Sequence, residues 1–284
     1  MKTYLDKNVY EAALERIAYC FQEFDNVLVA FSGGKDSGVL LNLCYNYADE
    51  HGLLDKLTMY HLDYEAQYQM TTEYVTRTFL EQFPGIRKMW YCVPIKAQSA
   101  CALGEPYWTP WDAAKKKLWV RAMPENPYVV HEGNLDVPFR HGMVDYEFQD
   151  KLSRHFAKKR GTTAVMVGLR ADESLNRYAA VARGKKRRSY EGRKWITQTS
   201  AVTANVYPLY DWRVSDIWTA TARFGFDYNR LYDLLYQAGL TAGQMRVASP
   251  FNDCAQESLK LYKVIDPSNW ARMIGRVNGV NFTG

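Results

Sequence analysis

Hydrophobic residues along this chain occur either in short continuous runs or at helical spacing. The short runs, each bounded by polar or glycine-containing turns, predict buried strands at residues 27–31, 57–62, 89–93, 164–168 and 202–207. Apolar positions three or four residues apart predict helices at 9–24, 39–47, 67–83, 145–160, 214–224, 228–237 and 256–265. Because strands and helices alternate, we expect an α/β fold with a parallel five-stranded sheet and helices on both faces.

The alternation of strands and helices is interrupted between residues 94 and 145. This stretch contains many Pro, Trp and Gly residues and is longer than an ordinary connection, so it predicts an insertion or a lid over a site. Within it, the aromatic stretch at 107–111 either caps the core, which we favour, or stacks on a base. We expect an α/β domain over residues 1–242 and a C-terminal helical extension over 243–284.

Composition places the chain among ordinary globular proteins. It has 284 residues, 47% hydrophobic and 24% charged. The first 20 residues contain acidic side chains and lack a continuous apolar region, and no apolar run approaches the ~20 residues of a membrane span. We therefore expect a cytoplasmic protein. The five cysteines are scattered without a CxxC pair, which predicts free thiols and no iron–sulfur cluster.

Positive charge is concentrated in one segment of the chain. The net charge is +5, and residues 183–194 hold seven basic side chains and one acidic one, so the remainder is close to neutral. Such a segment indicates a nearby anionic ligand or a nucleic-acid phosphate backbone. A solvated loop is the alternative interpretation.

The glycine-rich turn at residues 32–37, SGGKDS, is the strongest chemical signal. It lies where a predicted strand enters a helix, so backbone amides and the helix dipole can converge on an anion such as pyrophosphate. We expect Lys35 to be exposed at a cleft as a point charge, with Ser32 and Ser37 as hydroxyl donors. Asp36 can hold a magnesium ion that neutralises the remaining phosphate oxygens.

Three sequence blocks resemble one enzyme superfamily. The SGGKDS turn resembles the PP-loop of the ATP pyrophosphatase and adenine nucleotide α-hydrolase superfamily, which cleaves ATP between the α and β phosphates. Residues 168–177 (GLRADESLNR) and 207–218 (YPLYDWRVSDIW) are similar to two blocks of its phosphoadenosine-phosphosulfate reductase branch. The resemblance covers residues 9–240 and is strongest to the reductase-like subgroup called immunoglobulin-binding regulator A.

The chain also departs from the reductase pattern. Sulfonucleotide reductases carry a nucleophilic cysteine in a C-terminal E-C-G-[IL]-H segment, whereas Cys254 lies in Asn-Asp-Cys-Ala-Gln. We therefore do not expect sulfonucleotide reduction. The resemblance to the superfamily still implies nucleotide binding and chemistry at the α-phosphate.

The predicted strands place a set of candidate site residues at their carboxyl ends, where open α/β sheets bind ligands. Residues Leu62 to Tyr64 would read the adenine edge, and the carboxylate of Asp63 or Glu65 would reach ribose hydroxyls or metal, although turn polarity is an alternative. Arg170 and Arg177 would contact phosphate or sulfate oxygens, although a structural ion-pair cluster is an alternative.

Glu173 would orient Arg170 or help to hold metal. We assign catalytic roles to Lys35, Asp36 and Arg170, with Asp36 as a magnesium ligand. The expected nucleotide-binding residues are Ala30, Phe31, Ser32, Gly33, Gly34, Ser37, Leu62, Asp63, Gly168, Glu173, Ser174 and Arg177.

Three hypotheses about function follow. The first is a magnesium-dependent enzyme that binds ATP or a related adenine nucleotide and releases pyrophosphate while adenylating an unknown acceptor. The second replaces ATP by phosphoadenosine phosphosulfate, with residues 183–194 receiving its extra phosphate. The third is a nucleotide-sensing regulator whose basic segment binds nucleic acid. The family resemblance also implies a ParB-like or sulfiredoxin-like protein partner.

Overall fold

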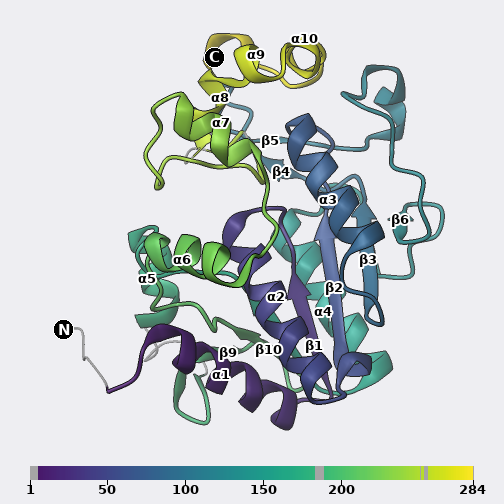
Figure 1. Cartoon of the computed structure of the whole chain (residues 1–284). Coiled ribbons are helices and arrows are strands. Elements are labelled where there is room, and N and C mark those ends of the chain that lie inside the picture. The colour runs from purple at the N-terminus through teal and green to yellow at the C-terminus, as the bar shows by residue number, and fades with distance from the viewer. Residues whose placement is uncertain (1–5, 183–188, 250, 253–254, 284) are drawn as a thin grey trace.

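The computed structural model of the chain describes residues 6–182, 189–249, 251–252 and 255–283. Within these residues, the main sheet has eight strands and helices pack on both of its faces (Figure 1). Across the sheet the strands are β6 (Val129–His131), β3 (Arg87–Cys92), β2 (Leu57–Leu62), β1 (Asn26–Ala30), β7 (Thr163–Val167), β10 (Thr203–Val206), β9 (Arg193–Gln198) and β8 (Ser189–Tyr190).

The α/β class and the five expected strands are confirmed, and these strands form the parallel centre of the sheet as β1, β2, β3, β7 and β10. The expected number of strands is too small, because the sheet continues on both sides. On one side β6, which belongs to the segment expected as an insertion, pairs in parallel with β3. On the other side β9 and β8 add an antiparallel hairpin.

The helices have the following bounds. Those before the C-terminal segment are α1 (Val9–Glu23), α2 (Lys35–Glu50), α3 (Gln69–Glu81), α4 (Asp145–Arg160), α5 (Leu175–Ala182), α6 (Val214–Phe224) and α7 (Leu231–Gln237). The C-terminal helices are α8 (Gln256–Lys260), α9 (Tyr262–Ile265), α10 (Pro267–Arg276) and α11 (Val280–Thr283). Short 3-10 turns occur at η1 (Leu54–Lys56) and η2 (Ala113–Leu118), and β4 (Ala97–Gln98) pairs with β5 (Tyr107–Trp108).

Alternate residues of each central strand face opposite layers of the core. In β1, Val27 and Val29 pack in the cluster formed with α1, α2, α3 and α6, whereas Leu28 packs in the cluster formed with α4. All three side chains are fully buried, which explains why this strand is continuously apolar rather than alternating.

The C-terminal helices form a separate layer beyond the carboxyl ends of the strands, next to α7 (Figure 1). Their cluster joins Tyr262 and Met273 of this layer to Leu231 of α7, Tyr68 before α3 and Trp108 of β5. The aromatic stretch therefore caps the core, as favoured from the sequence, with Trp108 in the cluster of the C-terminal layer and Trp111 in the cluster of the main sheet. Among the described helices, none combines the length and the apolar composition that a membrane span requires.

Candidate active site

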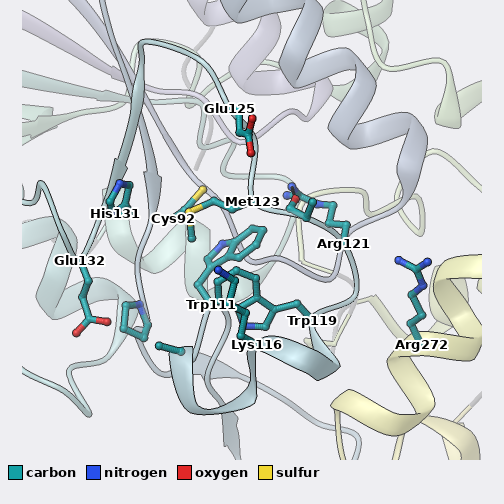
Figure 2. Close-up of a pocket in the computed structure, with 13 residues that line it drawn as sticks. Cys92, Trp111, Lys116, Trp119, Arg121, Met123, Glu125, His131, Glu132 and Arg272 are labelled. Carbon is teal, nitrogen blue, oxygen red and sulfur yellow. Dashed lines mark hydrogen bonds between the residues drawn. The ribbon is translucent and has the colours of Figure 1, made fainter.

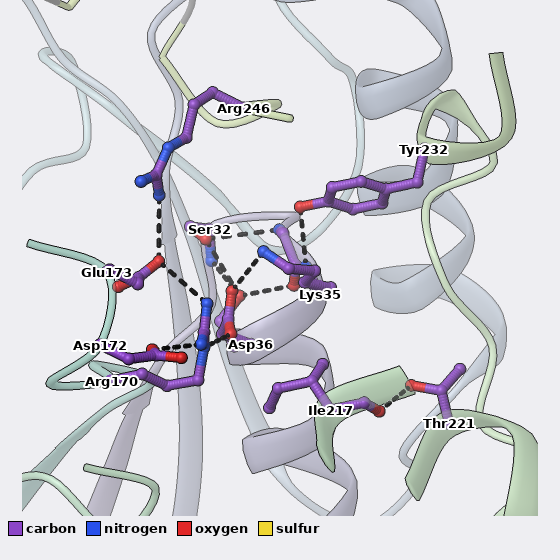
Figure 3. Close-up of polar contacts among 12 residues, drawn as sticks. Ser32, Lys35, Asp36, Arg170, Asp172, Glu173, Ile217, Thr221, Tyr232 and Arg246 are labelled. Atoms are coloured by element: carbon purple, nitrogen blue, oxygen red, sulfur yellow. Dashed lines mark hydrogen bonds and ion pairs between the residues drawn. The ribbon is translucent and has the colours of Figure 1, made fainter. Parts of the chain in front are cut away.

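The glycine-rich turn lies between the carboxyl end of β1 and the first turn of α2 (Figure 3). Gly33 has φ +77°, and a Cβ there would lie 3.0 Å from Cγ2 of Val75, so a side chain would be strained and crowded. The hydroxyls of Ser32 and Ser37 lie 3.0 Å apart, and the Ser37 hydroxyl donates to the carbonyl of Gly34 at 3.0 Å. These hydroxyls thus fix the turn itself.

The preceding residues lead the chain into this turn. Phe31 donates its amide to the carbonyl of Tyr60 at 2.8 Å and so continues the pairing of β1 with β2 beyond Ala30. The Phe31 carbonyl accepts a hydrogen bond from Nδ1 of His61 at 2.8 Å, and both side chains are buried. Residues 30 and 31 therefore position the turn through the backbone.

The end of β7 lies directly against the turn. A Cβ on Gly168 would approach the backbone carbon of Asp36 and the amide nitrogen of Ser37 to 2.9 Å each. Real Cβ atoms do not come this close to backbone atoms, so glycine is required at this position. The glycine brings the loop after β7, with Arg170, next to the start of α2.

Lys35 is buried, with 4% of its surface exposed, and the expectation that it is exposed at a cleft is wrong. Its ammonium lies 2.9 Å from Oδ2 of Asp36 and 5.4 Å from the ring centroid of Tyr232. The Tyr232 hydroxyl also accepts a hydrogen bond from the backbone amide of Lys35 at 3.1 Å. Sequence analysis missed Tyr232, which comes from α7 and covers the lysine.

Asp36 receives positive charge from two sides. Besides Lys35, the Nε of Arg170 forms an ion pair with its other carboxylate oxygen. Burial alone would raise the pKa of Asp36, but the charges of Lys35 and Arg170 outweigh burial and lower that pKa below its ordinary value. The carboxylate is therefore ionised and aligns the lysine with the arginine.

Arg170 begins a chain of ion pairs that continues through the loop after β7 (Figure 3). It pairs with Asp172 and lies 3.6 Å from Glu173. Glu173 in turn pairs with Arg177 at 2.9 Å and with Arg246 at 3.0 Å. Sequence analysis missed Asp172 and Arg246, and Arg246 lies far along the chain in the segment that follows α7.

The cluster has more cations than carboxylates. Its four cations are Lys35, Arg170, Arg177 and Arg246, and its three carboxylates are Asp36, Asp172 and Glu173. Ser174 supports the cluster by accepting a hydrogen bond from the backbone amide of Arg177 at 3.2 Å. An excess of positive charge beside the amide-rich start of a helix can bind an anion.

The geometry does not favour a protein-held magnesium ion at Asp36. Both oxygens of this carboxylate already contact cations, Lys35 and Arg170. Among the described residues, no group of three His, Cys, Asp or Glu side chains is arranged to hold a metal ion. The residues present thus do not fit the expected magnesium site, because a carboxylate bound to two cations is not free as a ligand.

Asp63 and Glu65 belong to a different network. Asp63 is fully buried and pairs with the guanidinium of Arg121 at 2.5 Å, while the indole nitrogen of Trp90 donates to it at 2.7 Å. Burial alone would raise the pKa of Asp63, but the charge of Arg121 outweighs burial and lowers it. Glu65, also fully buried, pairs with Arg276 of α10 at 2.8 Å.

The expectation that one of these two carboxylates reaches ribose or metal is therefore not met, because the protein itself uses both. Leu62 ends β2, pairs with Tyr91 of β3 and packs its side chain in the core on the α4 face. The backbone of Asp63 is engaged as well, because its amide donates to the carbonyl of Tyr91 and its carbonyl accepts from the indole of Trp111, each at 2.9 Å. Contact of adenine with the backbone of Leu62 and Tyr64 stays a prediction.

Part of the basic segment at 183–194 lies outside the described residues. Cys254 also lies outside them. In the described part, Glu191 and Gly192 have positive φ angles and form the turn between β8 and β9. The guanidinium of Arg193 lies 4.0 Å from the ring centroid of Tyr19 in α1, and the Tyr190 hydroxyl donates to Glu23 at 2.5 Å. Residues 189–193 thus pack on α1.

Comparison with known proteins assigns most of the chain to one family. A family model described as the phosphoadenosine phosphosulfate reductase domain matches residues 26–238, and one described as a domain of unknown function matches residues 239–284. Uncharacterized protein YbdN of Escherichia coli (strain K12) is 35% identical over 283 residues, covering 99% of this chain and 68% of YbdN.

Solved structures with a similar arrangement include three enzymes. Phosphoadenylyl-sulfate reductase from Candida auris has TM-score 0.45 and 14% identity, over 87% of this chain and 96% of the reductase. FMN adenylyltransferase from Candida glabrata has TM-score 0.43 and 14% identity, over 81% and 62% of the two chains. The U34-tRNA thiolase NcsA from Methanococcus maripaludis has TM-score 0.40 and 11% identity, over 99% and 82%.

The family match spans the sheet, the glycine-rich turn and the loop after β7, and so includes the elements that supply the cationic cluster apart from Arg246, which lies beyond residue 238. The match is to the reductase domain as a whole, and the finer subgroup expected from the sequence stays a prediction. The chain belongs to the phosphoadenosine phosphosulfate reductase domain family.

Proposed function

We propose that this protein is an adenine-nucleotide-dependent enzyme that cleaves ATP at the α-phosphate, releases pyrophosphate and transfers the adenylyl group to an acceptor. The observation that carries the proposal is the cationic cluster around Asp36, at the start of α2 and against the end of β7. Three separate segments supply its charges, namely the glycine-rich turn, the loop after β7 and the segment after α7, so the cluster can contact a polyphosphate from more than one side.

The proposed roles follow from the contacts. The β- and γ-phosphates would lie at the amide-rich turn, where a phosphate oxygen replaces the Tyr232 hydroxyl on the amide of Lys35. Arg170 would neutralise charge that develops on the α-phosphate and the leaving oxygen. Arg177 and Arg246, which are more exposed than Arg170, would contact outer phosphate oxygens.

In the proposed reaction an oxygen of the acceptor forms a bond to the α-phosphorus while the bond to the bridging oxygen breaks. Pyrophosphate leaves with the electron pair of that bond, and any proton on the attacking oxygen passes to solvent. Catalysis consists of positioning and charge neutralisation, as in other phosphoryl transfers. Magnesium enters the proposal only as a counterion of the nucleotide, because Asp36 is already paired with Lys35 and Arg170.

The test is to incubate the protein with ATP and magnesium and to separate AMP plus pyrophosphate from ADP plus phosphate. The proposal predicts AMP and pyrophosphate, with hydrolysis by water in the absence of an acceptor. The variant Arg170→Met should abolish this product, and Lys158→Ala, which changes an exposed lysine on α4, is the matched control. ADP as the product, or equal rates in wild type and Arg170→Met, would contradict the proposal.

The family match supports a second candidate, in which the nucleotide is phosphoadenosine phosphosulfate. In this case the cluster would bind the sulfate and 5′-phosphate groups, and the protein would transfer the sulfuryl group rather than reduce it. Competition binding separates the candidates: displacement of a labelled ATP analogue by adenosine 3′,5′-bisphosphate at much lower concentration than by AMP favours the sulfonucleotide.

A further inference from the structure

A second candidate site lies at the carboxyl ends of β3 and β6, two and three strands away from β1 (Figure 2). Here an open cavity of about 570 Å³ is lined by residues of the segment from 94 to 145, by Cys92 at the end of β3 and by Arg272 of α10. This volume falls in the range of small-molecule pockets. Residues 32–37 do not line it, and we call it the insertion pocket.

The apolar wall of the insertion pocket is built around two tryptophans. The rings of Trp111 and Trp119 lie edge to face with centroids 5.1 Å apart. Their indole nitrogens donate to the carbonyls of Asp63 and Asp112 respectively, each at 2.9 Å. Because these hydrogen bonds fix both rings and use their only donors, the wall is preorganised for contact with a flat apolar group.

The rim of the insertion pocket carries positive charge that the protein does not neutralise. Lys116 lies 5.7 Å from the ring centroid of Trp119, and Arg272 donates to the carbonyl of Val120 at 3.0 Å. Neither cation forms an ion pair within the described part of the chain, and both are exposed. By contrast, the charge of Arg121, which also lines the cavity, is balanced by Asp63.

Neither acidic side chain of the lining forms an ion pair with Lys116 or Arg272 among the described residues. Glu132 lies 2.6 Å from Nε2 of His141. Glu125 is drawn on the opposite side of the pocket from Lys116 (Figure 2). Lys116 and Arg272 lie well apart (Figure 2), so an acidic group of a ligand that contacts Trp119 can meet Lys116 without meeting a carboxylate, while Glu125 can accept a hydrogen bond from the ligand.

We propose that the insertion pocket binds a small planar aromatic molecule that carries an acidic group, with the ring against Trp119 and the acid toward Lys116. This site is separate from the cationic cluster and does not depend on the proposed nucleotide chemistry. The site is formed by the segment from 94 to 145 together with α10. The proposal therefore gives a function to two regions that do not contribute to the cluster around Asp36.

The test uses 4-methylumbelliferyl phosphate, whose two fused rings carry one phosphate group, in equilibrium dialysis against the full chain. The uncharged 7-methoxy-4-methylcoumarin and inorganic phosphate separate the contribution of the ring from that of the charge. Both should bind at least about tenfold more weakly than the aromatic phosphate, since a charge-assisted hydrogen bond contributes this much. Equal binding of the three probes, or no binding of the aromatic phosphate at about 1 mM, would overturn the proposal.

Variants locate the bound probe. Lys116→Met should weaken binding of the aromatic phosphate about tenfold, and Trp119→Leu should weaken it by a similar factor. Lys263→Met, at an exposed lysine of α9 outside the lining, and Lys35→Met should leave binding within about twofold. Lys116 is exposed, so its variant should fold. Binding lost in Lys35→Met but retained in Lys116→Met would place the probe at the phosphate turn and refute the proposal.

Discussion

Two ion-pair networks lie at the carboxyl edge of the same sheet, and their charges are arranged differently. Around Asp36, four cations meet three carboxylates, and the side chains of Arg177 and Asp172 are partly exposed. Around Asp63 and Glu65, two arginines meet two fully buried carboxylates. The first network has a net positive charge that can attract an anionic ligand. The second network has no net charge, and its carboxylates are buried.

The difference shows why position at a strand end does not by itself identify a binding residue. Asp63 follows β2 as directly as the glycine-rich turn follows β1, so the sequence suggests similar roles for both. Glu65, however, contacts Arg276 and accepts hydrogen bonds from the backbone amides of Trp111 and Val120 at 2.7 and 3.0 Å. This network therefore ties the segment after β5 and the C-terminal helices to the sheet.

The largest expected loss of stability comes from removing one partner of the neutral network around Asp63 and Glu65. Arg276→Met leaves the carboxylate of Glu65 buried without its cation, which should lower the free energy of unfolding by about 3 to 5 kcal/mol. Urea denaturation followed by circular dichroism measures the change. Arg272→Met, one turn earlier on α10 and exposed, should change stability by less than about 0.5 kcal/mol.

A second variant tests whether uncompensated charge is the cause. Adding Glu65→Gln to Arg276→Met removes the buried charge, so the double variant should be more stable than Arg276→Met alone. If the double variant is less stable by the sum of the two single effects, the pair does not act as a unit.

In the cationic cluster, loss of a charge should affect the ligand more than the fold. Lys35→Met removes a charge-assisted contact to phosphate, which should weaken ATP binding by about 1.5 to 3 kcal/mol. Asp36 keeps Arg170 as its partner, so the loss of stability should be smaller than for Arg276→Met. Isothermal titration calorimetry with ATP measures the affinity, and unchanged affinity would contradict the assignment of this turn as a phosphate site.

The close approach of Gly168 to the start of α2 can be tested by a substitution that leaves every charge of the cluster unchanged. Gly168→Ala places a methyl group 2.9 Å from backbone atoms of Asp36 and Ser37, so the two loops must separate at a cost of about 1 to 3 kcal/mol. ATP affinity and the thermal midpoint should both fall. Gly243→Ala is the matched control, because no atom lies within 4 Å of the added methyl group and its φ is not positive.

The smallest effect expected is a pH dependence of stability from His61, whose Nδ1 donates to the carbonyl of Phe31 at 2.8 Å. Burial lowers the pKa of His61, and the nearby charge of Asp63 only partly opposes burial. The native state therefore binds the proton less readily than the unfolded state, whose histidine pKa is about 6.5. Stability is complete above this pH and falls as the pH decreases, by at most about 1.4 kcal/mol per pH unit.

The contribution of His61 to stability changes in a different pH range from the contributions of Asp36 and Asp63. Asp36 and Asp63 have lowered pKa values, so the stability they provide is present above about pH 3.9 and is lost only below it. Urea denaturation of wild type and His61→Gln between pH 7.5 and 4.5 separates the windows. The variant should lack the slope near pH 6, and an identical slope in both proteins would show that another group titrates.

The sequence predicts those parts of the fold and site that depend on neighbouring residues. The run at 27–31 is apolar throughout because β1 is buried on both faces, and the turn at 32–37 carries its own glycines and hydroxyls. By contrast, β6 is a strand of three half-buried residues inside irregular sequence, and no periodicity can be detected over so short a length.

Contacts between distant residues could not be predicted. Arg246 reaches Glu173 from a loop beyond α7, and Tyr232 reaches Lys35 across 197 positions in the sequence. Neither residue lies in a local pattern that distinguishes it from other arginines or tyrosines. The burial of Lys35 has the same origin, because the side chain that covers it comes from another element.

The pairing of Glu65 with Arg276 has a consequence for the order in which the chain becomes stable during synthesis. The two residues are 211 positions apart. At the usual speed of translation, Arg276 emerges on the order of 10 to 40 s after Glu65. During this interval the carboxylate has no arginine partner and must remain hydrated, which holds the loop after β2 open. We therefore expect the nascent chain to retain a protease-sensitive loop near residue 65 until α10 has left the ribosome.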